Sequence, residues 1–205
     1  MSATRGPVTV VEVGPRDGLQ NEKQLVPLEA KLAFLNALSA SGLSVIEATA
    51  FVSPKAIPQL ADGEEVFARM EKRAGVRYPV LVPNLKGLER ALPLGVREIA
   101  VFTAASETFN QRNINTSIDG SFERFAPVIA RARPEGVRVR GYVSCGFGCP
   151  YEGAVAPRKV AEVAARLLEA GCDEISLGDT IGVGVPSQVP DVVGETRGAG
   201  VPVEL

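Results

Sequence analysis

Short runs of β-branched and apolar residues recur along this 205-residue chain, with room for one helix between most of them. The runs start near residues 8, 44, 79, 98, 137, 173 and 201, and most of the intervals are 28 to 39 residues long. Such runs are typical of buried strands, because β-branched side chains pack well on a pleated surface. A strand followed by one crossover helix is the repeating unit of a parallel sheet. The sequence therefore predicts an alternating α/β fold.

Helical patterns fill several of the intervals. Residues 27–42 place leucines at helical spacing between a Pro and a Gly, which suit the first turn and the stop. Residues 157–170 show the most regular pattern. Asp119 is expected to cap another helix, and Pro127 to kink or shorten it. Less regular helices are expected over residues 57–72 and 186–197.

Two parallel architectures fit this alternation. A doubly wound sheet usually carries G-x-G-x-x-G after its first strand, but residues 14–22 read GPRDGLQNE. A (β/α)₈ barrel places polar functional residues after the carboxyl ends of several strands. Such residues are present here: Arg16, Asp17, Glu47, Asn84, Thr103, Ser106, Tyr142, Ser144 and Asp179. The prediction is a TIM (β/α)₈ barrel forming one domain over residues 1–205. About six and a half of the eight units are present, since a full barrel takes ~250 residues.

Composition excludes several kinds of function. Lys and Arg number 22 and Asp and Glu 24, so there is no basic footprint for nucleic acid. The apolar stretches are too short to span a bilayer. Three Cys argue against a disulfide scaffold and favour a cytoplasmic protein. The chain has no His, which excludes His-based triads and His metal ligands within these residues. Cys145 and Cys149 are expected to be structural thiols, because a zinc site needs four ligands.

Two segments carry groups suited to chemistry. Arg16 and Asp17 follow the first strand, either as part of a surface turn or as an active pair. In the second case Asp17 offers oxygen to a divalent metal, and Arg16 a cation to a carboxylate or an enolate. Glu47 ends a buried strand and needs a partner, most simply Arg16. Residues 178–184 form either a Gly-rich connector or a substrate-contacting loop around Asp179.

The polar residues 106–117 (SETFNQRNINTS) are expected to form a long loop. Loops of this length between a strand and a helix are uncommon, and unusual length favours a functional role.

Seven ordered segments together form a recognisable pattern: EVGPRDGLQNE (12–22), GLSVIEATAFVSPK (42–55), YPVLVPNLKG (78–87), NINTS (113–117), RGYVSC (140–145), GCPYEG (148–153) and EISLGDTIGVG (174–184). On these segments the chain resembles the hydroxymethylglutaryl-CoA lyases, which are metal-dependent barrel enzymes with an RDG-type opening. The resemblance implies retro-Claisen cleavage of 3-hydroxy-3-methylglutaryl-CoA to acetyl-CoA and acetoacetate, with Mg²⁺ or Mn²⁺ as cofactor and a place in leucine degradation. It also implies an acyl-CoA substrate and allows for a homodimer.

The resemblance also implies roles for individual residues. Asp17 corresponds to a metal ligand, and Arg16 to the residue that contacts the substrate carbonyl and stabilises the enolate. Glu47 and Asp179 correspond to acidic residues near the reacting groups and are expected to be catalytic. Substrate-binding positions are expected at Arg16, Gln20, Asn113 and Tyr142.

Other parts of the family pattern are expected beyond Leu205: an H-x-H pair and an Asn that bind the metal, and a catalytic Cys. High-affinity metal binding by these 205 residues alone is therefore not expected. Two alternatives stay open at this point. One is a related aldolase or synthase acting on acyl-CoA or 2-oxo acids, and the other is an inactive truncated fragment.

Overall fold

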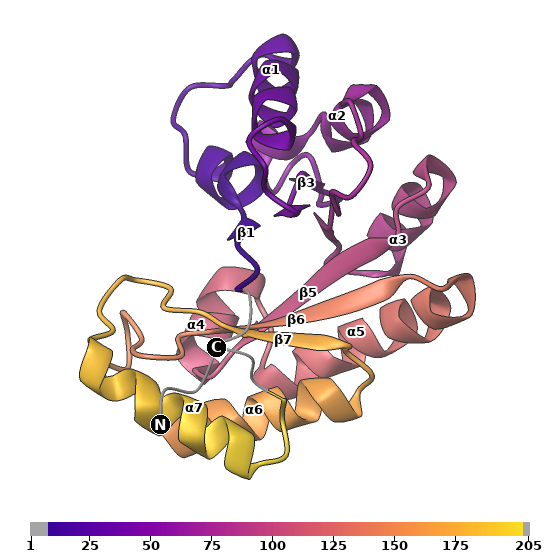
Figure 1. Cartoon of the computed structure of the whole chain (residues 1–205). Helices are drawn as coiled ribbons and strands as arrows, with labels where there is room; N and C mark the ends of the chain where they lie inside the picture. The colour runs from indigo at the N-terminus through magenta and orange to yellow at the C-terminus, as the bar shows by residue number, and fades with distance from the viewer. Residues whose placement is uncertain (1–7, 203–205) are drawn as a thin grey trace, which may run out of the picture. The chain divides into compact units, whose positions relative to one another are not determined.

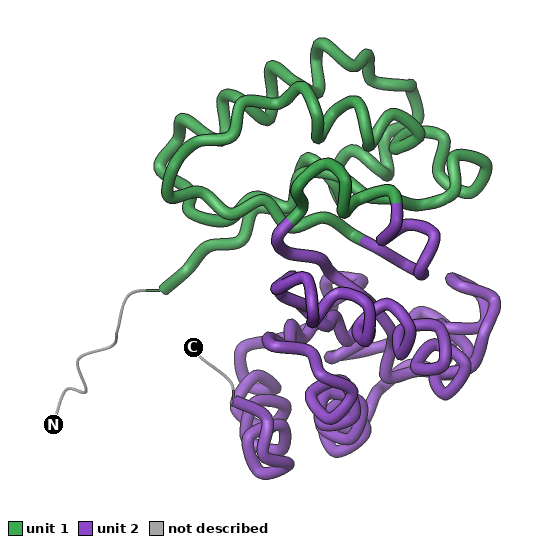
Figure 2. Tube along the Cα trace, turned by 90° about the vertical axis from the view of Figure 1, so that its right-hand side faces the viewer, with its two compact units in different colours: residues 1–81, 90–96, 205 green, residues 82–89, 97–204 purple. Residues whose placement is uncertain are grey.

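The computed structural model describes residues 8–202, which form two compact units (Figure 2). Unit 1 consists of residues up to 81 together with residues 90–96, and unit 2 of residues 82–89 and those from 97 onward. The chain passes between the units after residues 81, 89 and 96, and the second of these boundaries falls within the short helix α3 (Leu85–Ala91). The single domain expected over residues 1–205 stays a prediction.

Unit 1 is built on short parallel strands: β1 (Val11–Glu12), β2 (Val45–Ile46), β3 (Thr49–Ala50) and β4 (Val80–Leu81). β2 pairs with β1, with Val11 beside Val45. β3 pairs with β4, with Thr49 beside Val80. Residues 45–50 therefore lie between two neighbouring strands, and all six are buried. The apolar run at residues 45–46 forms a strand because both of its faces are covered.

The helical elements of unit 1 are η1 (Gly14–Gly18), α1 (Leu28–Ser39), η2 (Pro58–Leu60), α2 (Gly63–Arg69) and η3 (Leu92–Leu94). α1 follows Pro27 and buries Leu32 and Leu35, as the leucine spacing predicts. The helix expected over residues 57–72 is correct only in part, because a short 3₁₀ turn precedes the seven-residue α2.

Unit 2 is a regular strand-and-helix structure (Figure 1). Its strands are β5 (Glu98–Ala104), β6 (Arg138–Ser144) and β7 (Glu174–Leu177). β6 lies between the other two and is parallel to both. The main helices are α4 (Glu107–Ile114), α5 (Ile118–Ala132), α6 (Pro157–Glu169) and α7 (Val189–Gly198), with 3₁₀ turns η4 (Arg133–Glu135) and η5 (Pro186–Gln188). In Figure 1, α5, α6 and α7 lie along one side of these strands.

Successive side chains of β6 point alternately toward the helices and away from them. Val139 and Val143 are fully buried, and a Cβ at Gly141 would lie 3.1 Å from Leu167 of α6. These residues therefore face the helices. Because successive strand residues point to opposite faces, Arg140, Tyr142 and Ser144 point away from them.

Three sequence expectations are corrected in unit 2. α5 is capped by Ser117 and not by Asp119, since the Ser117 hydroxyl oxygen accepts the N–H of Gly120 at 2.9 Å. Pro127 does not shorten α5, because it is on the exposed side and the carbonyl it leaves free can bind water, whereas the kink expected there stays a prediction. Residues 106–117 do not form a loop, since most of them form α4, with Ser106 as its N-cap.

The strand expected to start at residue 201 is not confirmed. Val201 and Pro202 are not in a strand, and residues 203–205 lie outside the described part. Over residues 8–202, the helices are all too short or too polar to cross a membrane.

Candidate active site

Arg16 and Glu47 are joined by an ion pair in unit 1. The Arg16 Nε donates to Oε1 of Glu47 across 31 positions of the chain. The Glu47 side chain has no exposure, and that of Arg16 retains 11%. A fully buried carboxylate needs a cationic or hydrogen-bonding partner, and Arg16 is such a partner. The pairing predicted from the sequence is confirmed.

Asp17 lies beside this pair at the surface. The Arg16 Nη1 donates to Oδ1 of Asp17 at 2.6 Å, and the Asp17 side chain is 53% exposed. Arg16 therefore contacts a buried carboxylate and an accessible one. A guanidinium held at two edges has little freedom to rotate, which suits a group that must meet developing negative charge at a fixed point.

The turn that carries Arg16 and Asp17 is fixed by its backbone. The N–H groups of Arg16, Asp17 and Gly18 all point to the carbonyl oxygen of Val13, at 3.1, 2.7 and 3.4 Å. The Gly14 N–H also donates to Oε1 of Glu12 at 2.6 Å, and a Cβ at Gly14 would lie 2.7 Å from that oxygen, so a larger residue would require the Glu12 side chain to shift. The GPRDG segment is thus a compact helical turn at the carboxyl end of β1, not a loose surface turn.

Glu47 is placed by the strands on both sides of its segment. Its N–H donates to the carbonyl of Glu12 at 2.8 Å, and the next N–H, of Ala48, donates to Pro79 at 2.9 Å. The backbone at residues 47 and 48 is therefore held by the segments on both sides of it.

Gln20, a predicted substrate-binding residue, is half-buried in a helical turn directly after η1.

Tyr142 lies on the face of β6 that points away from the helices, between Arg140 and Ser144. The Arg140 guanidinium lies 5.3 Å from the centre of the Tyr142 ring, within cation–π range. Arg140 also donates to Oε1 of Glu174 at 2.6 Å, and its buried Nε has no partner among the described residues. Arg140 was not among the site residues predicted from the sequence, although a charged residue in an apolar strand is itself a signal.

Asp179 follows β7 in an exposed loop. Its Oδ1 accepts the N–H of Val183 at 3.1 Å, and its Oδ2 accepts that of Gly184 at 2.9 Å. Asn113 lies exposed in the last turn of α4. The structure thus brings Arg16, Asp17 and Glu47 together in unit 1, and it places Asn113, Tyr142 and Asp179 in unit 2. The roles predicted for these residues stay predictions.

Other strand-end residues serve the packing of helices. Thr103 is fully buried, and its hydroxyl oxygen accepts hydrogen bonds from Asn110 of α4 at 2.9 Å and from Ser121 of α5 at 2.8 Å. Ser106 caps α4 by accepting the N–H of Phe109 at 3.0 Å. These two residues hold α4 and α5 against β5.

A metal site would need several ligands close together. The described residues contain no group of three or more His, Cys, Asp or Glu side chains that could hold a metal ion. Asp17 offers one accessible carboxylate, whereas Mg²⁺ and Ca²⁺ take about six or more oxygen ligands. The described residues alone therefore do not complete a metal site, and Asp17 as a ligand stays a prediction.

All three cysteines are reduced and buried. Burial raises the pKa of Cys145 to about 12, and burial together with the nearby Asp173 raises that of Cys172 to about 12. Burial alone would also raise the pKa of Cys149. Its bonds to Ser106 and to the N–H groups of Tyr151 and Glu152 outweigh burial and lower the pKa.

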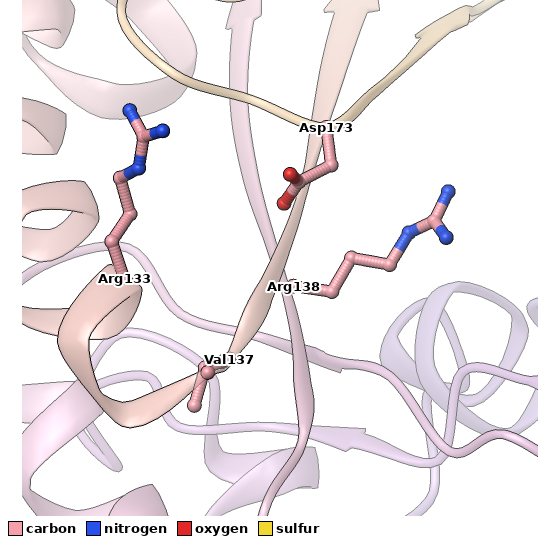
Figure 3. A pocket seen from close by; sticks show the side chains of 5 residues that line it. Arg133, Val137, Arg138 and Asp173 are labelled. Atoms are coloured by element: carbon pink, nitrogen blue, oxygen red, sulfur yellow. The ribbon is translucent and has the colours of Figure 1, made fainter.

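A shallow surface pocket lies at the opposite ends of the strands of unit 2. It is lined by Arg133, Gly136, Val137, Arg138 and Asp173, which lie at the amino ends of β6 and β7 (Figure 3). In parallel α/β barrels the functional residues occupy the carboxyl ends, where Asp179 lies. This pocket is therefore not the candidate active site.

A comparison with known proteins identifies the family of this chain. Residues 7–199 match the model of the family described as HMGL-like. The chain belongs to the HMGL-like family.

Individual relatives with known names are also similar to this chain in sequence. The chain is 60% identical over 177 residues to the 3-hydroxy-3-isohexenylglutaryl-CoA/hydroxy-methylglutaryl-CoA lyase of Pseudomonas aeruginosa, covering 86% of this chain and 59% of that protein. It is 56% identical over 186 residues to the mitochondrial hydroxymethylglutaryl-CoA lyase of Rattus norvegicus, covering 91% of this chain and 57% of that protein. The chain thus spans slightly more than half the length of these relatives.

A solved HMGL-like structure shows the fold. The crystal structure of hydroxymethylglutaryl-CoA lyase from Pseudomonas aeruginosa matches 95% of this chain and 65% of that chain, with a TM-score of 0.92 and 55% identity. The predicted TIM-barrel class is confirmed by this likeness, and the doubly wound alternative is wrong.

Proposed function

We propose that this chain carries the acyl-CoA-binding and enolate-stabilising residues of a hydroxymethylglutaryl-CoA lyase. The observation that supports this most directly is the Arg16–Glu47 pair, a guanidinium fixed by a buried carboxylate at the carboxyl end of β1. The family match and the names of the relatives give the substrate class.

The proposed reaction is a retro-Claisen cleavage. A base removes the proton from the tertiary hydroxyl of 3-hydroxy-3-methylglutaryl-CoA, and the hydroxyl-bearing carbon becomes the ketone of acetoacetate. The electron pair of the broken carbon–carbon bond passes into the thioester, which forms the enolate of acetyl-CoA. Protonation of that enolate at carbon then gives acetyl-CoA.

Arg16 is proposed to stabilise the enolate. It would donate N–H hydrogen bonds to the thioester oxygen, where negative charge develops as the carbon–carbon bond breaks. Glu47 orients the Arg16 guanidinium and balances its charge from the buried side. The bond from Arg16 to the enolate oxygen is stronger than its bond to the ground-state carbonyl, because the enolate oxygen carries more negative charge. A donor that is already fixed in place needs no reorganisation to make this bond.

The remaining positions complete the proposal. Asp17 would contribute one ligand to Mg²⁺ or Mn²⁺, and no step is assigned to the metal because the described residues do not complete its site. Gln20, Asn113 and Tyr142 are proposed to contact the substrate, and Asp179 to lie near the reacting groups. The cytoplasmic location stays a prediction, since one relative is named mitochondrial. The homodimer also stays a prediction.

The test is a cleavage and binding assay on the 205-residue chain. 3-Hydroxy-3-methylglutaryl-CoA is supplied with Mg²⁺ or Mn²⁺, and acetyl-CoA and acetoacetate are measured together with equilibrium binding of the substrate. We expect saturable binding that Arg16→Met weakens and that the exposed-surface control Arg158→Met leaves unchanged.

Alternative substrates form the second arm of the assay. The isohexenyl analogue tests whether the side chain on the substrate is discriminated, because the Pseudomonas aeruginosa relative is named for both compounds. Cleavage of 2-oxo acids in preference to the acyl-CoA would favour a related aldolase or synthase. Absence of both binding and cleavage of every acyl-CoA would overturn the proposal.

A further inference from the structure

The loops that follow β6 and β7 are joined to each other by hydrogen bonds. The N–H of Cys145 donates to the Thr180 hydroxyl oxygen at 2.7 Å. The N–H of Gly146 donates to the carbonyl of Gly178 at 2.8 Å. Two successive amides of one loop are therefore bound by the other, directly after the strands end.

The second loop is closed on itself by Asp179. This carboxylate receives the N–H groups of Val183 and Gly184, one on each oxygen. The Asp179 side chain is exposed, so its charge stays hydrated while it binds the two amides. It fixes the turn of residues 179–184 without the cost of burying a carboxylate.

Glycines allow the two loops to pack closely. A Cβ at Gly148 would lie 2.8 Å from Cγ2 of Val183, and one at Gly184 would lie 3.0 Å from Cγ of Phe147. Real Cβ atoms essentially never approach within 3.0 Å of another heavy atom. The first contact thus leaves no room for a methyl group unless Val183 shifts.

Cys145 holds an unusual backbone conformation at the junction. Its φ is +62°, which residues with a side chain rarely adopt. Strained backbone persists where the surroundings hold it in place, and such positions cluster at functional sites. Here the Thr180 hydroxyl binds the N–H of Cys145 itself.

We propose that Asp179 and Thr180 are positioning residues that hold residues 145–149 and 178–184 as one rigid loop platform. This platform fixes the carboxyl end of β6, three residues after Tyr142. Its consequence for catalysis rests on the proposed function: a loosened platform is expected to raise KM through Tyr142 and to change kcat less.

Amide hydrogen exchange on the 205-residue chain, followed by NMR, tests rigidity without requiring activity. Thr180→Val removes the acceptor and keeps the shape of the side chain, so exchange at Cys145 should accelerate about tenfold, as expected for one lost hydrogen bond. Thr180→Ser keeps the hydroxyl and should restore slow exchange.

Asp179→Ala distinguishes a platform from two independent loops. Asp179 bonds to Val183 and Gly184, and none of its hydrogen bonds reaches Cys145 or Gly146. In a rigid platform this substitution also accelerates exchange at Cys145 and Gly146. If only Val183 and Gly184 respond, the proposal is overturned.

A steric rescue provides the second test. Gly148→Ala places a Cβ 2.8 Å from Cγ2 of Val183, so exchange should accelerate unless the half-exposed Val183 side chain turns away. The double variant Gly148→Ala with Val183→Ala removes the methyl group that clashes and should recover slow exchange. Gly194→Ala is the matched control, since a Cβ there meets nothing within 4 Å. Accelerated exchange that persists in the double variant would contradict the proposal.

The two proposals fail separately. If the exchange results hold but the unmodified chain neither binds nor cleaves acyl-CoA, the platform stands and the proposed function falls. If the chain is active and Thr180→Val raises KM without changing exchange, the platform is wrong and the function stands.

Discussion

Arg16 Nε donates to Oε1 of Glu47, and this bond joins an accessible turn to a carboxylate that is completely buried. The pair lies where β1 and β2 end, so it links the carboxyl ends of two neighbouring parallel strands. The same guanidinium binds the exposed Asp17. One cation therefore connects the interior of unit 1 with its solvent-exposed surface.

Breaking this pair should destabilise the protein. Arg16→Met removes the guanidinium from a buried carboxylate, and loss of one partner of a buried pair costs about 3–5 kcal/mol. Urea unfolding measures the change. Replacing Glu47 as well, by Met, should recover part of the loss, because no buried charge is then left. The exposed pair Arg158–Glu162 is the control, and Arg158→Ala should cost less than ~0.5 kcal/mol. Equal effects at both pairs would contradict a buried ion pair.

Asp17→Asn should behave differently from Arg16→Met. The Asp17 carboxylate is exposed, so its removal should change the free energy of unfolding by no more than ~1 kcal/mol. Mn²⁺ binding, followed by electron paramagnetic resonance, should be weak in the unmodified chain and weaker still in this variant. Tight binding that survives Asp17→Asn would show that the metal-ligand prediction for Asp17 is wrong.

The thiols should react slowly and in a defined order. With pKa values raised to about 12 by burial, Cys145 and Cys172 have roughly one thiolate in ten thousand at pH 8. Cys149 has a lowered pKa and should react first with Ellman's reagent, in a phase that Cys149→Ser removes. In denaturant all three should react together. A native chain in which Cys172 reacts first would contradict this order.

Acid should release the contact between Glu152 and α4. The backbone N–H of Thr108 donates to Glu152 at 2.8 Å and is the main cause of the lowered pKa of that carboxyl group. A lowered pKa stabilises the fold above the ordinary value of 4.5, and this contribution is lost as pH falls through the folded-state pKa. The Thr108 amide shift should titrate with a midpoint below 4.5. Glu152→Gln should abolish that titration, and its persistence in the variant would assign it to another group.

The edge of unit 2 should make the 205-residue polypeptide prone to association. Every side chain of β7 is only half-buried, whereas β5 is almost entirely buried. Exposed strand edges and partly covered apolar faces favour pairing with other chains. Light scattering should show species larger than a monomer. A monodisperse monomer that unfolds cooperatively would contradict this expectation.

The sequence by itself determined the alternation of strands and helices and the resemblance to the family. The run at residues 137–143 and the helical spacing in residues 157–170 became β6 and α6 within a residue or two. Local patterns suffice there because an element that buries one apolar face must repeat its apolar residues at the spacing of a helix or of a strand. This spacing does not depend on which partner covers the face. The pairing of Arg16 with Glu47 could also be predicted, since a carboxylate ending a buried strand needs a cation nearby.

Only the tertiary structure decided contacts between segments distant in sequence. Residues 106–117 look like a polar loop, yet they form α4 because Thr103 binds Asn110 from inside and Ser106 caps the first turn. Asp179 is predicted from the sequence only as an acidic residue near the reacting groups, yet both of its oxygens bind amides of its own loop. These outcomes depend on which partner satisfies each polar group, and side-chain periodicity carries no information about such partners.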